Sequence, residues 1–291
     1  HLSFAAAARE LRTTAATVSR RVSELESELG AQLLHRTTRQ VRLTAEGEAY
    51  LRGAEAVLER VRRLDEGVAA RQSGPSGRLR IGCGVSVGQA FLLDAVAAFL
   101  KAHPRIDVEL VLEDRHVNLV ERGLDATVRI GQLRDSSMKM SKLGVATHVA
   151  CASPDYLSSR PELPAHPDDL AELDLIVDTN QPRAWSFRAT DGKAAYEVVP
   201  RGRLVVNNAH CARQAALAGL GIAQIPTFVV GDELRRRDLL PVLQNYTLPA
   251  PPISLMHPGR RSKKLQLFQR FLEARLQPVP PWDRWRTAGA E

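Results

Sequence analysis

The sequence predicts an α/β protein built from a small helical head, one long helix and a larger α/β part. Three observations predict this order. Residues 1–44 contain two short helical segments and a hairpin, residues 45–71 carry a heptad pattern, and residues 72–291 alternate short apolar strands with helices. Alternation of this kind indicates a mainly parallel sheet with helices on its faces. At roughly 150 residues per domain, a chain of 291 residues is long enough for about two domains.

Composition narrows the class of protein before any motif is considered. With 44% hydrophobic and 25% charged residues, the chain is typical of soluble globular proteins. Three cysteines are too few for a disulfide framework, so we expect a reducing compartment, the cytoplasm. Because the first residues do not show a basic segment followed by an apolar one, we expect no secretory signal. The longest uncharged stretch, 214–231, contains Gly219, Gly221 and Pro226, which fits a helix, turn and buried strand better than a membrane span.

The net charge of +7 permits nucleic acid or an anionic ligand as a partner and establishes neither. The positions of individual arginines are more informative than the net charge.

The first two helices have clear start signals. Ser3 can cap a helix with an inward face of Phe4, Ala7, Ala8 and Leu11, and Thr14 can cap a second helix that continues to residue 29. On this second helix one narrow arc is apolar, and we expect it to face the core. It consists of Val18, Val22, Leu25 and Leu29.

The opposite face of the second helix is small and hydroxylated, with Arg20 near its centre. Such a face suits the DNA major groove, because small residues allow close approach, hydroxyls reach phosphates or bases, and arginine can bridge guanine O6 and N7. The predicted contacts on this helix are Thr14, Ala16, Thr17, Ser19, Arg20, Arg21 and Ser23. For any single arginine, a solvated surface charge is about as good an interpretation; the combined pattern favours DNA.

A hairpin follows the second helix. Gly30 is placed to end the helix in the left-handed conformation, and residues 33–43 then alternate as paired strands with Val41 and Leu43 inward. Three outward arginines would act as a wing on the phosphate backbone or in the minor groove. They are Arg36, Arg39 and Arg42.

Residues 45–70 predict one amphipathic helix, about 39 Å long at 1.5 Å per residue. Apolar residues recur along it at spacings of four and three, which is a heptad seam. We expect a second copy of the chain to cover this seam and form a homodimer; packing on the helix's own domain is the alternative. The seam is Tyr50, Ala54, Val57, Val61, Leu64 and Val68. Residues 71–77, RQSGPSG, are typical of a linker.

The second part predicts a series of strands with two main helices, at 90–102 and 264–276. The expected strands are 79–83, 106–112, 126–130, 145–151, 175–177, 204–206, 222–225 and 253–256.

A glycine-rich turn follows the first of these strands. Gly82, Gly84 and Gly88 superficially match a dinucleotide fingerprint, but the spacing is GxGxxxG, and the acidic pair Glu113-Asp114 lies about thirty residues on where roughly twenty is usual. An oxidoreductase is therefore a weak alternative, testable by whether NAD or NADP protects against thermal unfolding. The turn still places Ser86, Val87 and Gly88 at a helix start, where a carboxylate or a similar anion can bind.

Nothing else in the chain indicates catalysis. The eight histidines are scattered, and neither HExxH nor CxxC occurs, so we expect no enzyme activity, no metal and no cofactor. Cys83, Cys151 and Cys211 leave a cysteine-based redox sensor as an alternative, with His210 beside Cys211 as its one suggestive neighbour. Thiol labelling tests this idea, because three unreactive thiols would exclude it.

The run SFAAAARELRTTAATVSRRVSELESELGAQLLHRTTRQVRLTAEGEAYL, residues 3–51, resembles the winged helix-turn-helix of LysR-type transcriptional regulators almost position by position. The segments GLDATVRIG, ASPDYL and ALAGLGIAQIP extend the resemblance. It implies a DNA operator, a homodimer through the linker helix and a homotetramer that bends the operator. Family members begin with a further helix before the position of His1, so the winged domain is expected to be incomplete at its start.

The resemblance also implies a two-lobed effector domain, similar to periplasmic solute-binding proteins, that clasps a small molecule, including an anionic one. Lobe I would comprise about 78–148 with 250–277, and lobe II about 149–249. The effector residues expected by resemblance are Ser86, Val87, Gly88, Arg129, Ile130, Gly131, Thr147, Asn207, Asn208, Ile225 and Pro226. For Asn208 a helix N-cap is the better explanation than a ligand contact. A solute-binding or carrier protein is the competing function, and residues 3–45 argue against it because a carrier does not need them.

Overall fold

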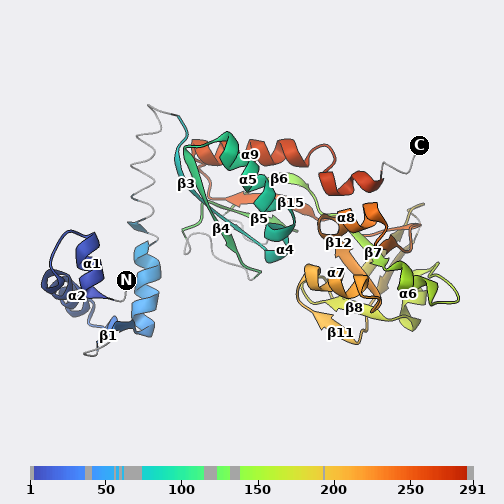
Figure 1. Cartoon of the computed structure of the whole chain (residues 1–291), viewed down its shortest axis with the longest axis horizontal. Coiled ribbons are helices and arrows are strands. Elements are labelled where there is room, and N and C mark those ends of the chain that lie inside the picture. Colours follow the sequence, from blue (N-terminus) through green and yellow to red (C-terminus); the bar gives the residue numbers. More distant parts are fainter. Residues whose placement is uncertain are drawn as a thin grey trace. The chain divides into compact units, whose positions relative to one another are not determined.

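The computed structural model describes residues 3–36, 41–55, 57–58, 61, 74–114, 123–131, 138–192 and 194–286. The chain divides into two compact units (Figure 1). One unit comprises His1–Gln72 and Val120–Gly123, and the other comprises Ser73–Leu119 and Leu124–Glu291.

Local capping defines the helices of the first unit. Helix α1 (Phe4–Glu10) begins after Ser3, whose Oγ accepts a hydrogen bond from Ala6 N at 3.3 Å. Helix α2 (Ala15–Leu29) begins after Thr14, whose Oγ1 accepts from Thr17 N at 3.2 Å. It ends at Gly30, which adopts the left-handed conformation with φ 63°. These three signals confirm the predicted caps.

The hairpin is also confirmed, as strands β1 (Leu34–Arg36) and β2 (Val41–Leu43) pair antiparallel with Leu34 opposite Leu43. The predicted apolar faces are covered less completely. Val18, Val22 and Leu25 are half-buried, whereas Leu29, in the last turn of α2, is 44% exposed. The prediction that Leu11 faces inward is wrong, since α1 ends at Glu10 and Leu11 no longer follows its periodicity.

A third helix begins directly after β2, and its described helical residues are 45–55, 57–58 and 61. Thr44 Oγ1 accepts a hydrogen bond from Gly47 N at 2.9 Å and so caps the helix start. Within the predicted seam Tyr50, Val57 and Val61 are exposed and Ala54 is half-buried. Leu64 and Val68 lie outside the described residues. The exposed seam residues therefore make little contact with their own unit. This observation argues against the alternative that the seam packs on its own domain.

The first sheet of the second unit has the strand order β4-β3-β5-β15-β6. Strands β4 and β5 run parallel to β3, whereas β15 is antiparallel to both of its neighbours. The bounds are β3 (Gly77–Cys83), β4 (Ile106–Leu112), β5 (Ala126–Ile130), β6 (Lys139–Val145) and β15 (Pro252–His257). The prediction of one strand at 145–151 is wrong, because the chain leaves this sheet after Val145 and begins a new strand in the second sheet at His148.

A continuous helical segment packs on the first sheet. It comprises α4 (Val85–Val87), the π-helical turn η1 (Gly88–Leu92) and α5 (Leu93–Ala102), and it begins earlier than the predicted residue 90. Phe99 of α5 meets Phe268 of helix α9 (Lys263–Leu276) with ring centroids 5.0 Å apart. By length and composition alone, with mean hydropathy 1.5, residues 85–102 could cross a membrane; Leu92 and Phe99 are instead fully buried in this core.

The second sheet has the strand order β11-β8-β12-β7-β13. The bounds are β11 (Leu204–Val206), β8 (Leu175–Asp178), β12 (Ile222–Pro226), β7 (His148–Ala152) and β13 (Leu240–Pro241). Helices α7 (Ala209–Leu217) and α8 (Thr227–Arg236) precede and follow β12 in the chain.

Smaller elements complete this part of the second unit. A small sheet, not predicted from the sequence, has the order β10-β9-β14, with bounds Ala195–Val198, Trp185–Ala189 and Tyr246–Thr247. Two short helices are also present, α6 (Pro154–Ser158) and the 3-10 helix η2 (Pro167–Glu172).

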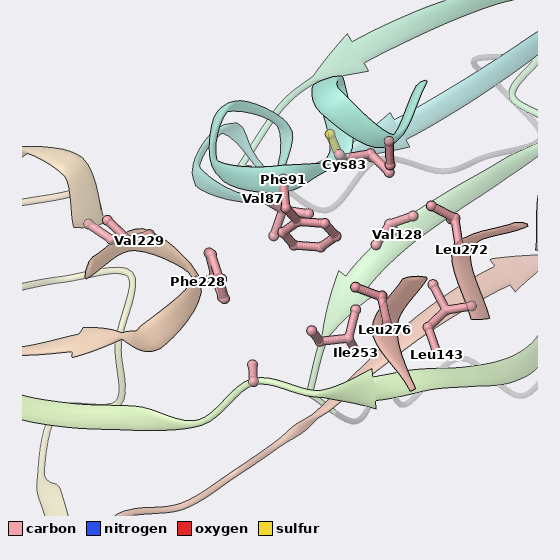
Figure 2. Close-up of a cluster of buried hydrophobic side chains, with 14 of the residues drawn as sticks. Cys83, Val87, Phe91, Val128, Leu143, Phe228, Val229, Ile253, Leu272 and Leu276 are labelled. Carbon is pink, nitrogen blue, oxygen red and sulfur yellow. The ribbon is translucent and has the colours of Figure 1, made fainter. Parts of the chain in front are cut away.

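One buried apolar cluster joins the two larger sheets (Figure 2). Phe91, from the helical segment on the first sheet, lies 5.7 Å from Phe228 at the start of α8, measured between ring centroids. Trp282 lies 4.7 Å from Phe91 by the same measure and belongs to a C-terminal 3-10 helix, η3 (Pro281–Arg286), that the sequence did not predict. This cluster is therefore shared between the two larger sheets, and side chains from three distant segments meet in it.

Candidate nucleic-acid interface and binding cavity

The face of α2 predicted to read DNA is exposed. Thr14, Ala16, Arg20, Arg21 and Ser23 are all exposed, and Thr17 and Ser19 are half-buried. The Arg20 side chain is 72% exposed, and its Nε lies 3.6 Å from Glu24 Oε1 one turn further along the helix. An exposed pair of this kind contributes little to stability, so Arg20 can leave it at small cost.

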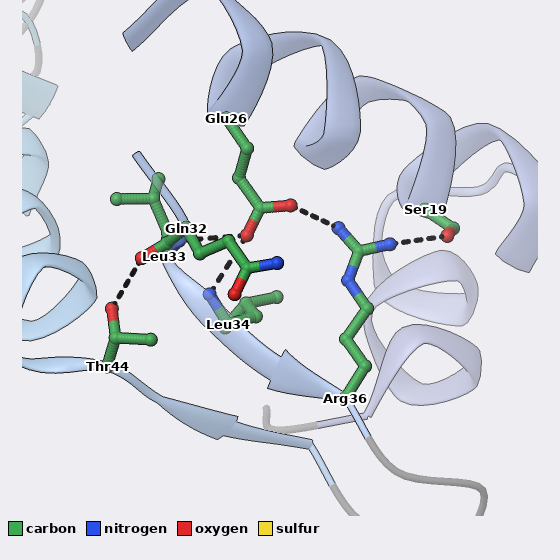
Figure 3. Close-up of polar contacts among 7 residues, drawn as sticks. All are labelled: Ser19, Glu26, Gln32, Leu33, Leu34, Arg36 and Thr44. Atoms are coloured by element: carbon green, nitrogen blue, oxygen red, sulfur yellow. Dashed lines mark hydrogen bonds and ion pairs between the residues drawn. The ribbon is translucent and has the colours of Figure 1, made fainter. Parts of the chain in front are cut away.

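One of the three hairpin arginines has partners that the sequence did not predict. Arg36 is exposed, but its guanidinium is engaged within the unit: its Nη2 donates to Glu26 Oε2 at 2.7 Å and its Nη1 to Ser19 Oγ at 3.2 Å (Figure 3). Its guanidinium also lies 5.2 Å from the centroid of the Phe4 ring. The cause is the carboxylate of Glu26, which needs a cationic partner. Arg42 is exposed as predicted, and Arg39 lies outside the described residues.

Glu26 joins α2 to the hairpin, a role the sequence analysis missed. Its Oε1 accepts hydrogen bonds from Leu33 N at 2.8 Å and Leu34 N at 2.9 Å, and its side chain is only 14% exposed. Burial, the largest single influence, opposes ionisation, but the hydrogen bonds from Leu34 and Leu33 and the charge of Arg36 together lower the pKa of Glu26. The sequence contains one signal for this role: Glu26 is an acidic residue directly after Leu25, at the edge of the apolar arc.

The lowered pKa predicts acid sensitivity of the first unit. A carboxyl whose folded pKa is depressed contributes stability above its ordinary value of 4.5, and that contribution is lost as the pH falls through the folded pKa. We expect Glu26→Gln to destabilise the first unit at pH 7 by about 1.5–3 kcal/mol, the scale of hydrogen bonds to a charged group, and to flatten its pH dependence below 4.5. Hydrogen exchange at the amides of Leu33 and Leu34 measures the loss. Glu24→Gln, on the exposed face, is the matched control, and equal effects of the two variants would contradict the assignment.

A cavity of about 420 Å³ lies between the first and second sheets of the second unit. It is formed at the ends of strands β5, β8 and β12 and at the start of α4, the position where ligands bind in open α/β sheets. Its volume is within the range of small-molecule sites. Six of the expected effector residues line it: Ser86, Val87, Arg129, Ile130, Gly131 and Pro226.

The other five expected effector residues do not line this cavity. Gly88 and Ile225 are buried in the core. Thr147 Oγ1 is engaged by Thr227 Oγ1 at 2.7 Å and donates to Asp283 Oδ2 at 2.8 Å.

Two asparagines complete this correction. Asn208 caps α7, its Oδ1 accepting from His210 N at 2.9 Å, as the alternative interpretation held. The carbonyl of Asn207 accepts from Asn180 Nδ2.

Several lining residues were missed, and one of them changes the expected chemistry. Asp114 Oδ1 accepts a hydrogen bond from Val85 N at 2.9 Å, so the protein's own carboxylate occupies part of the helix start where an anionic ligand was expected. Asp178, at the end of β8, also lines the cavity. Burial raises the pKa of Asp178, and the charge of Asp114 adds to that effect.

The remaining polar lining is held by the second sheet and the segments that enter it. His148 Nδ1 lies 3.2 Å from Pro249 O and its Nε2 lies 3.1 Å from Gln181 Oε1, and burial lowers the pKa of the ring. Arg129 Nη1 donates to Glu113 O at 3.3 Å, and burial lowers the pKa of this guanidinium too. These positions are distant in the sequence and carry no shared motif.

The cysteines do not form a redox centre among the described residues. Cys83 and Cys151 are buried, and burial raises the pKa of each to about 12. A thiol with so high a pKa is not a reactive nucleophile at neutral pH. Cys211 is exposed and free. The described part of the chain also contains no group of three or more His, Cys, Asp or Glu residues that could hold a metal ion.

Two family descriptions match the chain. The LysR substrate binding domain matches residues 72–277, and the bacterial regulatory helix-turn-helix protein, lysR family, matches residues 1–48. Among relatives, the transcriptional regulator YhjC of Escherichia coli is 36% identical over 93% of this chain and 91% of its own. The regulator PtxR of Pseudomonas aeruginosa is 34% identical over 94% of this chain and 87% of its own.

Solved structures agree with these matches. The full-length virulence activator AphB of Vibrio cholerae is 27% identical, with a TM-score of 0.65 over 94% of this chain and 93% of its own. CrgA of Neisseria meningitidis is also 27% identical, with a TM-score of 0.62 over the same shares. The winged head, the two-sheet effector domain and these relatives together show that the chain belongs to the LysR family of bacterial transcriptional regulators.

Proposed function

We propose that α2 reads a DNA operator in the major groove and that a small molecule in the 420 Å³ cavity changes operator binding. The observation that carries the first part is the position of Arg20, which projects from an exposed face otherwise made of Ala16, Ser23 and hydroxyl-bearing neighbours. An arginine on such a face can make two hydrogen bonds to guanine while the small side chains let the helix approach.

The assembly is part of the proposal. Tyr50, Val57 and Val61 expose an apolar stripe along the helix that follows the head, and a second copy of the same helix would cover it. We place the chain in the cytoplasm as a tetramer of two such dimers. An effector would act by binding more tightly to one of two arrangements of this assembly and so raising its population.

Replacing Arg20 by alanine tests the reading role. We expect a loss of about 1–3 kcal/mol on the operator together with relaxed preference at the contacted base pair, since a bidentate base contact disappears. Arg42→Ala, on the exposed edge of the hairpin, should instead weaken all sequences about equally and reduce the salt dependence by about one phosphate contact.

The operator needed for this measurement can be found by sequencing genomic DNA that co-purifies with the protein. Arg188→Ala, on an exposed position of β9 in the other unit, is the matched control and should leave DNA binding unchanged. Equal losses on operator and random DNA for Arg20→Ala would overturn the assigned role.

A further inference from the structure

Two carboxylates line the cavity between the two sheets, beside neutral hydroxyl and amide side chains and Arg129. Asp178, at the end of β8, lines the cavity and is only 6% exposed. Asp114, in the loop after β4, lines it from the first sheet. A carboxylate accepts hydrogen bonds and donates none. The two sheets therefore each contribute one carboxylate to the same cavity.

A third group independently points to a ligand. Gln224, on β12, lines the same cavity and is also 6% exposed. Its Oε1 is buried and has no hydrogen-bond partner within the described part of the chain. Because an unpaired buried acceptor costs free energy, such a group is usually matched by a water, an ion or a ligand.

The positive charge of the lining does not balance these acceptors. Among the described lining residues, Arg129 is the one lysine or arginine. It already donates to Glu113 O at 3.3 Å and lies within the electrostatic influence of both Glu113 and Asp114. His148 is placed between two oxygen acceptors, Pro249 O and Gln181 Oε1. An added anion would thus meet two carboxylates and a cation that is already engaged.

We infer that the effector carries a protonated amine that binds Asp178 and Gln224, with Asp114 facing it from the first sheet. A protonated amine suits this wall because it has several donors and no acceptor. Pro226, Pro249 and Phe228 line the same cavity and provide apolar contacts for a compact hydrocarbon body. The inference rests on the proposed function, namely that the effector binds in this cavity, and it replaces the expectation of an anionic effector.

An amine at this position also supplies a reason for coupling between the sheets. Two carboxylates that face one cavity from opposite sheets repel each other, and a cation between them replaces repulsion with two attractions. Binding would thus favour the arrangement in which the two sheets lie closer together, which is the differential affinity that a regulatory switch requires.

Matched pairs of small molecules test the inference on the full-length protein. Cyclohexylamine is compared with cyclohexanecarboxylate, phenethylamine with 3-phenylpropanoate, and 1,4-diaminobutane with succinate, by thermal unfolding at pH 7. We expect at least one amine at millimolar concentration to raise the Tm saturably while its carboxylate partner does not. Asp178→Asn should weaken that amine's affinity about tenfold or more, because a charge-assisted hydrogen bond is lost. Asp155→Asn, an exposed position on α6 outside the cavity, should leave it unchanged.

A second measurement needs no ligand. Since the folded pKa of Asp178 is raised by burial, its neutral form stabilises the protein below the ordinary value of 3.8, and that stability is lost as the pH rises through the raised pKa. The neutral isostere Asp178→Asn should therefore raise the Tm of the unliganded protein at pH 7. Asp178 Oδ1 accepts one hydrogen bond from the protein, from Asn180 N at 3.0 Å, and the asparagine can keep it. A lowered Tm would mean that the protein satisfies the charged carboxylate beyond this one bond, which overturns the inference.

The possible failures are distinguishable. Absence of a saturable shift with every amine overturns the inference. A rise in Tm with a carboxylate that Arg129→Ala abolishes also overturns the inference. In that case the cavity would still be the effector site, but for an anionic effector. A compound of either class that binds in the cavity without changing operator affinity overturns the proposed effector role itself.

Discussion

Replacing Gly47 by alanine is expected to disrupt the first unit and abolish operator binding. Gly47 lies in the first turns of the helix that follows β2, and an added Cβ would stand 2.0 Å from Leu33 O and 2.9 Å from Leu33 C. Both atoms are backbone, so no side-chain rotation can relieve the overlap. Leu33 O also accepts the hydrogen bond from Thr44 N at 3.0 Å, and moving it breaks the junction between hairpin and helix.

We expect Gly47→Ala to cost about 3 kcal/mol, the upper end of overpacking effects, and to accelerate hydrogen exchange at Leu33 and Leu34. Gly53→Ala is the matched control, because it lies on the same helix and its added Cβ meets nothing within 4 Å. That variant should stabilise the helix by about 0.5–1 kcal/mol through lower backbone entropy in the unfolded state. Normal operator affinity in Gly47→Ala would contradict the close approach of the helix to Leu33.

The features that were predictable from the sequence depend on neighbouring residues. The caps at Ser3 and Thr14 and the left-handed Gly30 each act within about one helical turn, so their residue types identify them. Apolar runs likewise predicted the buried strands of the second unit, and β4 and β11 have the predicted bounds. In each case the residue pattern follows from the geometry of a few neighbouring residues.

What the sequence did not reveal depends on contacts between distant segments. The predicted strand at 145–151 divides at residues 146–147 because two different sheets supply partners on either side. The pairing of Arg36 was not evident because its partner Glu26 lies ten positions earlier on another element.

The same reason applies to the cavity. Asp114, Asp178 and Gln224 each resemble ordinary polar residues in isolation, and only the sheet topology brings them to one site. Local patterns predicted the strand ends, which is where ligands bind in such sheets. Long-range packing determines which charged side chains surround the cavity.

The C-terminal 3-10 helix η3 provides the second large effect. Its Trp282 packs against Phe91 at 4.7 Å and Phe228 at 6.1 Å, measured between ring centroids. Its Asp283 accepts a hydrogen bond at 2.8 Å from Thr147, which lies between β6 and β7, where the chain passes from the first sheet to the second. The segment therefore contacts the helical segment packed on the first sheet, helix α8 after β12 of the second sheet, and the crossover between the two sheets.

Gly231→Ala is expected to displace η3. Gly231 lies in α8, and an added Cβ would stand 2.4 Å from Trp282 O and 2.9 Å from Trp282 Cβ. To relieve this overlap η3 must move, and the stacking on Phe91 and the hydrogen bonds of Asp283 weaken together. We expect a destabilisation of about 2–3 kcal/mol of the second unit, detected as a lower Tm and as a change in tryptophan fluorescence.

Asp232→Ala supplies the comparison for this variant, since the neighbouring side chain is exposed and its ion pair with Arg235 at 2.7 Å should contribute less than about 1 kcal/mol. An unchanged Tm and unchanged fluorescence in Gly231→Ala would show that η3 does not rest on α8. Because Phe228 contacts Trp282 and also lines the cavity, displacement of η3 removes support from one wall of the proposed effector cavity. Gly231→Ala should therefore weaken effector binding, although Gly231 lies away from the polar lining of the cavity. Asp232→Ala should leave effector binding unchanged.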